Sequence, residues 1–150
     1  MLAGLNNLKR LSLPYSVKDV SPLTHLKNIS LLSLFLPPEA APDAVRVLSK
    51  CEFLSGLDEL FINAELLCES WTKKAQGLRS IEIVGDCRKA VDIAPLSLCG
   101  SLSSVTLFAS VLDLSPVLKL KGLNEFNLYP DIAYERYMAE RASNTPKELK

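Results

Sequence analysis

Six times along the chain, three apolar residues recur at positions one, four and six of a short segment. Successive segments start 21, 28, 21, 24 and 21 residues apart, and all eighteen positions hold Leu, Ile, Val or Phe. A match of this length does not arise by chance, so the repeat is real. The triplets are Leu8, Leu11 and Leu13; Ile29, Leu32 and Leu34; Leu57, Leu60 and Ile62; Leu78, Ile81 and Ile83; Leu102, Val105 and Leu107; and Leu123, Phe126 and Leu128.

The last two positions of each triplet flank a single residue, which is the period of a β-strand with one buried face. One short strand cannot bury three apolar side chains alone, whereas stacked strands merge them into a continuous core. We therefore predict six short parallel strands side by side. Their middle apolar positions are expected to form one file: Leu11, Leu32, Leu60, Ile81, Val105 and Phe126.

An Asp–aliphatic–small–Pro–aliphatic element follows three of these segments. It reads DVSPL from Asp19, DIAPL from Asp92 and DLSPV from Asp113. Because proline cannot donate a ladder hydrogen bond, we expect the extended segment to end there. The flanking aliphatic residues, such as Leu114 and Val117, are expected to turn toward the core.

The repeated L-x-x-L-x-L spacing and the D-[VIL]-[SA]-P-[LV] element resemble leucine-rich repeat proteins with a short unit of 21–22 residues, in particular the internalin and phosphatase-regulator subclasses. The resemblance covers Leu5 to about Pro130. It implies an α/β solenoid with about six short parallel strands on its concave face and turns and a few helices on its convex face. These families usually place Asn three residues after the second Leu of L-x-L. That column holds no Asn here, so we expect irregular turns at Pro37 and Glu65.

Two longer stretches, residues 37–54 and 64–75, are predicted to carry helices on the convex side, because their apolar residues recur at helical spacing. The 21-residue units leave room for little more than one helical turn. The predicted stripes are Ala41, Ala44, Leu48 and Cys51 in the first stretch and Leu67, Trp71 and Ala75 in the second.

The predicted domain organisation has three parts. Residues 1–130 form the repeat solenoid, 131–142 a C-terminal capping helix, and 143–150 a mobile tail. The apolar side of the capping helix consists of Tyr134, Tyr137 and Met138. At the amino end, the stretch MLAGLNNL is either the tail of a preceding repeat in a longer chain or closes the core with its own leucines.

Composition excludes several classes of function. Seventeen basic residues balance seventeen acidic ones, so no net field draws nucleic acid or an anionic membrane to the chain. No apolar run is long enough to span a bilayer. A single histidine, His25, and cysteines without metal-ligand spacing offer no metal site or catalytic constellation, and no glycine-rich phosphate loop occurs. We expect no cofactor, no metal and no enzymatic activity.

Cysteine usage favours a reducing compartment. The even count permits two disulfides, but four reduced thiols in a cytoplasmic protein is the preferred interpretation. A longer precursor would instead be secreted or located at a cell surface. The four cysteines are Cys51, Cys68, Cys87 and Cys99.

Residues that alternate with the core positions share the concave face, in register. Several are aromatic or aliphatic, and exposed aromatic residues on a rigid sheet are typical anchors of protein interfaces. A charge gradient runs along the face, with one Arg near the amino end and Glu residues further on. The predicted partner-binding residues are Arg10, Leu31, Phe35, Glu59, Phe61, Glu82, Phe108, Glu125, Asn127 and Tyr129.

The pattern predicts a non-enzymatic module that presents this curved sheet to a protein partner. Two other functions stay open: a regulatory or targeting subunit of an enzyme, and the recognition arm of a longer adhesin or effector. Two simpler explanations of the apolar residues also stay open. They could be ordinary β-formers, or a neighbouring domain could cover them.

Overall fold

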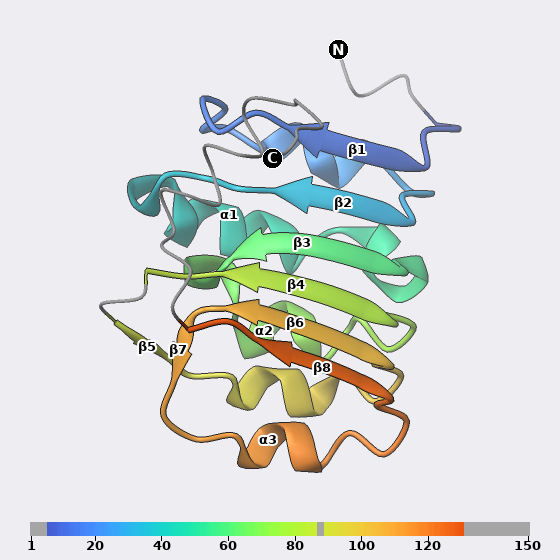
Figure 1. The fold of residues 1–150 in the computed structure, drawn as a ribbon. Helices are drawn as coiled ribbons and strands as arrows, with labels where there is room; N and C mark the ends of the chain where they lie inside the picture. The colour runs from blue at the N-terminus through green and yellow to red at the C-terminus, as the bar shows by residue number, and fades with distance from the viewer. Residues whose placement is uncertain (1–5, 87–88, 131–150) are drawn as a thin grey trace, which may run out of the picture.

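The computed structural model describes residues 6–86 and 89–130. Its main element is a six-stranded sheet in which every pair of neighbours is parallel and the strands follow one another in chain order (Figure 1). The sheet does not close into a barrel, because β1 and β8 lie at its two opposite edges. The predicted α/β class and the six parallel strands are therefore confirmed. The strands are β1 (Arg10–Leu13), β2 (Leu31–Leu34), β3 (Glu59–Asn63), β4 (Ser80–Val84), β6 (Ser104–Phe108) and β8 (Glu125–Leu128).

The register of the sheet stacks the apolar triplets as predicted. Each residue of the middle file pairs with the next, from Leu11 on β1 through Leu60 on β3 to Phe126 on β8. The four interior members of this file are essentially inaccessible to solvent, and its two end members are half-buried. A second file, from Leu13 to Leu128, runs beside the first in the same core.

A repeated backbone contact fixes this register where each strand begins. The carbonyl oxygen of Lys9 accepts hydrogen bonds from two consecutive N–H groups, those of Ser30 and Leu31, at 2.8 and 3.0 Å. The same doubled contact recurs at every later step between neighbouring strands of the sheet. The accepting carbonyls belong to Lys9, Ser30, Asp58, Arg79 and Ser103. Identical contacts at each step keep the strands aligned.

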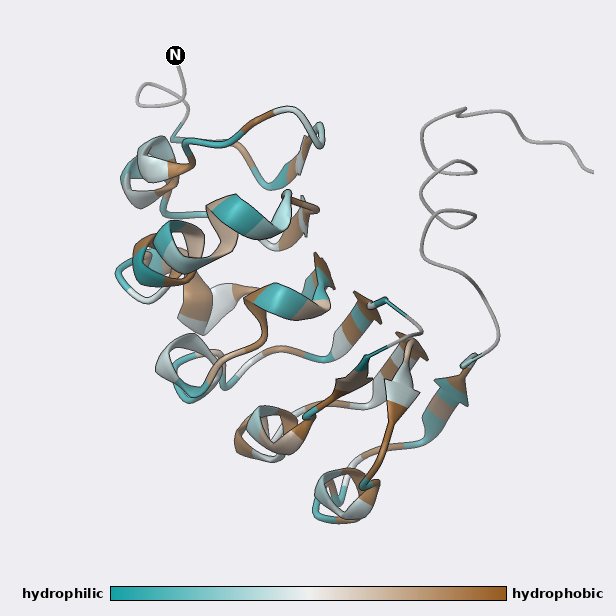
Figure 2. Cartoon of the chain, turned by 90° about the vertical axis from the view of Figure 1, so that its left-hand side faces the viewer, coloured by the Kyte–Doolittle hydropathy of each residue, from teal (hydrophilic) through white to brown (hydrophobic). Residues whose placement is uncertain are grey.

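Within the described residues, the helices lie on one side of the sheet, over the core, as Figure 2 shows. The α-helices are α1 (Ala41–Leu48), α2 (Glu69–Thr72) and α3 (Ser115–Leu118). The 3₁₀ helices are η1 (Ser21–His25), η2 (Pro38–Ala40), η3 (Glu52–Gly56), η4 (Ala64–Leu66) and η5 (Ala94–Leu98). A small second sheet pairs β5 (Ala90–Val91) with β7 (Ser110–Val111).

The two helix predictions have different outcomes. The stripe of α1 is buried as predicted, from Ala41 to Cys51. The second predicted helix is only one turn long, since α2 covers four residues and is preceded by the 3₁₀ turn η4. Trp71 anchors this turn: its ring is fully buried, and its Nε1–H donates to the Leu66 carbonyl at 2.7 Å.

The Asp–Pro elements form a repeated turn. In each, the Asp Oδ1 accepts the backbone N–H two residues later, at 3.0 Å for Asp19, 3.0 Å for Asp92 and 2.9 Å for Asp113. The following proline occupies the first turn of η1, η5 or α3, where no N–H is needed. The element therefore starts a short helix, which adds to the predicted role of ending an extended segment.

One flanking aliphatic residue contradicts the prediction. Val117 is buried in the core, but Leu114 is 42% exposed. The corresponding Val20 and Ile93 are buried within the stack. Leu114 belongs to the last of the three elements, at the edge of the described structure, where no further described unit packs over it. The predicted capping helix (131–142) and tail (143–150) lie outside the described residues.

Candidate interaction surface

The predicted binding residues lie on the outer face, by which we mean the side of the six-stranded sheet that points away from the helices. Two rows across the strands alternate with the core files and therefore occupy this face. The first row is Arg10, Leu31, Glu59, Ser80, Ser104 and Glu125. The second row is Ser12, Ser33, Phe61, Glu82, Thr106 and Asn127. The structure thus brings seven of the ten predicted residues together in two rows.

The remaining three residues are aromatic and lie at the carboxyl ends of strands. Phe35 follows β2, Phe108 is the last residue of β6, and Tyr129 follows β8. Phe35 and Val84 are buried together in a hydrophobic cluster that is separate from the main core, and Phe61 and Phe108 pack against them. We call these four residues the outer cluster. Tyr129 extends it, because its ring stacks on Phe108 with centroids 5.1 Å apart and planes at 18°.

Burial on this face differs from the expectation of exposed anchors. Leu31 and Phe35 are 8% and 5% exposed, Ser33 is 3% exposed, and Val84 is inaccessible. Tyr129, at 43%, is the most accessible of the predicted apolar residues. In the two rows, the residues of β2 are therefore buried, those of β3, β4 and β6 are half-buried, and Arg10 and Glu125 on the edge strands are exposed.

Charged side chains share the outer face with the outer cluster. Arg10 is exposed on β1, Glu59 and Glu82 are half-buried on β3 and β4, and Glu125 is exposed on β8. Glu125 accepts hydrogen bonds from Asn127 Nδ2 at 3.2 Å and contacts the Ser104 hydroxyl at 3.4 Å. The predicted change from one basic group to several acidic groups across the sheet is present in the structure.

An ion pair marks the starts of β3 and β4. Arg79 donates through Nε and Nη2 to the two carboxylate oxygens of Asp58, at 2.6 and 3.1 Å. These hydrogen bonds lower the pKa of the Asp58 carboxyl below its usual value. Both side chains are partly exposed, so the pair contributes little to stability.

Asn63 is a structural residue that the sequence pattern did not single out. Its side chain is 1% exposed, its Oδ1 accepts the Leu36 backbone N–H at 2.9 Å, and its Nδ2 donates to Glu65 at 2.7 Å. It therefore joins β3 to the segment after β2, which is the role expected of the Asn column that the chain lacks. A lone Asn among apolar neighbours was the available signal.

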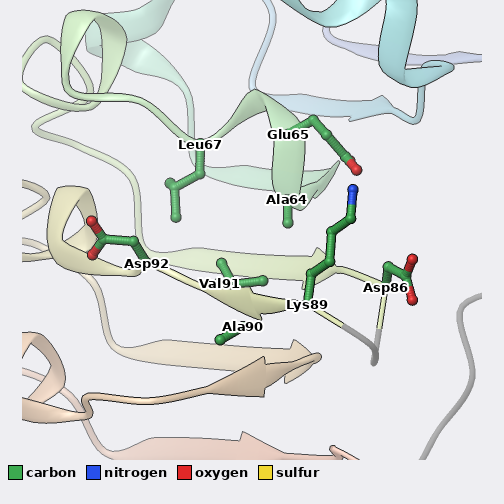
Figure 3. Close-up of a pocket in the computed structure, with 8 residues that line it drawn as sticks. All are labelled: Ala64, Glu65, Leu67, Asp86, Lys89, Ala90, Val91 and Asp92. Carbon is green, nitrogen blue, oxygen red and sulfur yellow. The ribbon is translucent and has the colours of Figure 1, made fainter.

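A groove of about 310 Å³ lies beside β5, between this strand and the segment that contains η4 (Figure 3). Lys89 extends toward Glu65 across it, and Asp92 lies at the opposite end (Figure 3). Asp92 already accepts a backbone hydrogen bond in its turn. A smaller adjoining groove of about 230 Å³ shares Ala90, Val91 and Asp92. The lining residues are Ala64, Glu65, Leu67, Asp86, Lys89, Ala90, Val91 and Asp92, without a His, Cys or Ser nucleophile.

Among the described residues, the cysteines and the histidine are not gathered into one site. Burial raises the pKa of the Cys51 and Cys99 thiols to about 12, so both are protonated at neutral pH and pack as apolar side chains. His25 is exposed at the end of η1. Within residues 6–86 and 89–130, no group of three or more His, Cys, Asp or Glu side chains is arranged to hold a metal ion.

In the described part of the chain, no helix has the length and apolarity that a membrane crossing requires. Comparison with known proteins adds no identity. The sequence matches no protein-family model and no curated protein.

Proposed function

We propose that the chain is a short leucine-rich repeat solenoid and that it acts as a non-enzymatic protein-interaction module. Its parallel sheet would form the concave face, and the more accessible aromatic residues in and beside the outer cluster, Phe61, Phe108 and Tyr129, would supply the apolar anchors for a protein partner. The repeat spacing and the in-register parallel strands support the family assignment. The free thiols of Cys51, Cys68 and Cys99 support a reducing, cytoplasmic location.

One observation carries the functional proposal: an apolar cluster exists on the sheet face opposite the core. A single-layer sheet over one core needs no second cluster for its own hydrophobic packing. Aromatic side chains with a polar and charged rim are the composition of an interface centre. Strands held by identical contacts are also preorganised, which lowers the entropy cost of binding.

Site-specific photo-cross-linking tests this proposal. A benzophenone side chain at Tyr129, beside the outer cluster, is expected to cross-link a discrete protein partner in native lysate. The same group at Leu118, which is 83% exposed on α3, is the matched control and is expected to give no such product. Cross-links of equal yield at both positions, or at Leu118 alone, would contradict the proposal.

The captured partner then allows a quantitative measurement. Replacing Tyr129 by Ser removes one accessible anchor, and we expect a loss of about 2 kcal/mol, which is roughly thirtyfold in Kd. Leu118→Ser serves as control and should leave the Kd unchanged. Unchanged affinity of Tyr129→Ser would remove this end of the outer face from the binding site.

A further inference from the structure

The two edges of the six-stranded sheet carry complementary backbone groups. At each step inside the sheet, one carbonyl accepts hydrogen bonds from two successive N–H groups of the next unit. By the same repeat, the β8 edge offers the carbonyl of Asn124, and the β1 edge offers the N–H groups of Lys9 and Arg10. Among residues 6–86 and 89–130, no strand pairs along the outer side of β1 or β8 (Figure 1). Such an edge is a template for a strand of another chain.

The charges at the two edges are opposite and lie in the same row of the outer face. Arg10 is exposed on β1 and Glu125 is exposed on β8, at equivalent positions of the register. Neither forms an ion pair with another described residue. The contacts of Glu125 are with the neutral side chains of Asn127 and Ser104. Opposite charges placed directly across two neighbouring strands attract, whereas like charges there destabilise the pairing.

Apolar residues are partly accessible at both ends of the stack. Leu11 and Leu13 on β1 are half-buried, as are Phe126 and Leu128 on β8. The interior members of the same two files are buried, because a unit packs on each side of them. One further step of the register would set Leu11 beside Phe126 and Leu13 beside Leu128. Each file would then continue without a break from one copy into the next.

Leu114 shows the same incomplete packing on the helix side. It is 42% exposed, although the corresponding Val20 and Ile93 of the two earlier Asp–Pro elements are 3% and 1% exposed. A position of a repeat is buried where a neighbouring unit packs over it. The last described unit therefore presents an apolar side chain at a position that a following unit would cover.

We propose that this following unit is the first unit of a second copy of the chain. In the assembly, β1 of one copy pairs in parallel with β8 of the other, at the ordinary strand spacing of about 4.8 Å. The carbonyl of Asn124 accepts the N–H groups of Lys9 and Arg10, and the Arg10 side chain pairs with Glu125. Because the contact joins two different surfaces, each pair of copies keeps one β1 edge and one β8 edge. Association therefore continues to a closed ring or an open chain of copies.

Sedimentation velocity of the purified full chain tests the assembly. We expect the weight-average mass to rise with protein concentration above the 16.5 kDa of one chain. We also expect it to fall when salt is added, because salt screens the ion pair between the copies. A protein that stays monomeric up to the highest concentration studied would overturn the inference.

Charge reversal identifies the contact. Arg10→Glu and Glu125→Arg each place like charges across the contact, and we expect either change to weaken association about tenfold. An equimolar mixture of the two variants should regain the wild-type affinity, because each variant then meets the opposite charge at both of its edges. Recovery in the mixture is specific to pairing of β1 with β8, since a two-fold contact would join one edge to itself. Failure of the mixture to recover would overturn the inference.

A matched pair of apolar substitutions tests the helix side of the same end. Leu114→Ser and Leu98→Ser remove side chains of similar exposure, 42% and 37%. In the other two Asp–Pro elements, the position of Leu98 holds His25 and Lys119, both exposed, so a following unit does not cover it. We expect Leu114→Ser to weaken association severalfold and Leu98→Ser to leave it unchanged, with the same circular dichroism for both. Equal association of the two variants would exclude this end as the contact surface.

These measurements use the purified chain alone and judge the contact between copies separately from the proposed function. In the cross-linking experiment at Tyr129, a product with the mass of two chains reports contact between copies. A product that contains another protein reports the partner. Loss of either product therefore contradicts one proposal and leaves the other standing.

Discussion

The two faces of the sheet are built from the same strands but differ in how strictly the residue type repeats from unit to unit. Leu60 and Phe61 are neighbours on β3. Leu60 lies in a file of apolar residues whose interior members are buried, whereas Phe61 lies in a row that also holds Ser33, Glu82 and Thr106. The core face repeats because every unit must fit against identical neighbours. The outer face is released from that requirement, so it is where the units differ and where binding properties can be varied.

The largest expected effect tests this contrast directly. Leu60→Ala should lower the free energy of unfolding by about 3 kcal/mol, since it opens a cavity between two packed units. Phe61→Ala, at the adjacent half-buried position, should cost about half as much. Urea unfolding of the two variants measures the difference. Equal losses would mean that both faces are core and would break the comparison.

The next effect concerns Asn63, which connects β3 to the segment after β2. Asn63→Leu should lower the free energy of unfolding by about 2 kcal/mol, because the buried backbone N–H of Leu36 loses the Asn63 Oδ1 as its acceptor. Glu65→Ala is the control: it removes the second partner of the Asn63 amide at an exposed position and should change stability little. A stable Asn63→Leu protein would show that hydrogen bonding between units is dispensable beside apolar packing.

The smallest effect is expected at the Asp–Pro turns, which start short helices on the core side of the sheet. The hydrogen bond from the Ser115 backbone N–H lowers the pKa of Asp113 below its ordinary value of 3.8. A lowered pKa means that the folded state favours the charged carboxylate, so the contribution to stability is present above pH 3.8 and is lost as pH falls through the folded-state pKa.

Asp113→Ala should accordingly lower the urea midpoint slightly at about pH 7 and by less at about pH 2.5, because protonation of the carboxyl below pH 3.8 progressively removes the favoured carboxylate. The same comparison for Asp19, whose pKa is lowered by the Ser21 N–H, is an internal replicate. A loss that is equal at both pH values would assign the effect to the local backbone alone.

Sequence periodicity predicts what depends on the repeat itself. The file from Leu11 to Phe126 and the burial of the α1 stripe follow from spacing alone, because only one register places all the apolar residues in one core. Periodicity also assigned residues such as Phe35 to the outer face. It could not show that Phe35 is buried there, because burial depends on what covers a face and not on the pattern within it.

The remaining differences have local causes. Leu114 is exposed because a repeated position is buried only where another unit packs over it. Helix α2 is short because η4 occupies part of the same stretch, with the Leu66 carbonyl committed to the Trp71 ring. Asn63 performs the connecting role from a position outside the expected column, and spacing rules cannot detect such a substitution.

The pair of hydrogen bonds that two successive backbone N–H groups donate to one carbonyl has a consequence for how such a chain can change. Each unit is attached only to the unit before it and the unit after it, through the same backbone groups. Gene duplication could therefore insert or delete a whole unit without rethreading the rest of the chain. The span of the molecule, and with it the size of any ligand it embraces, can be adjusted in steps of one strand spacing, about 4.8 Å.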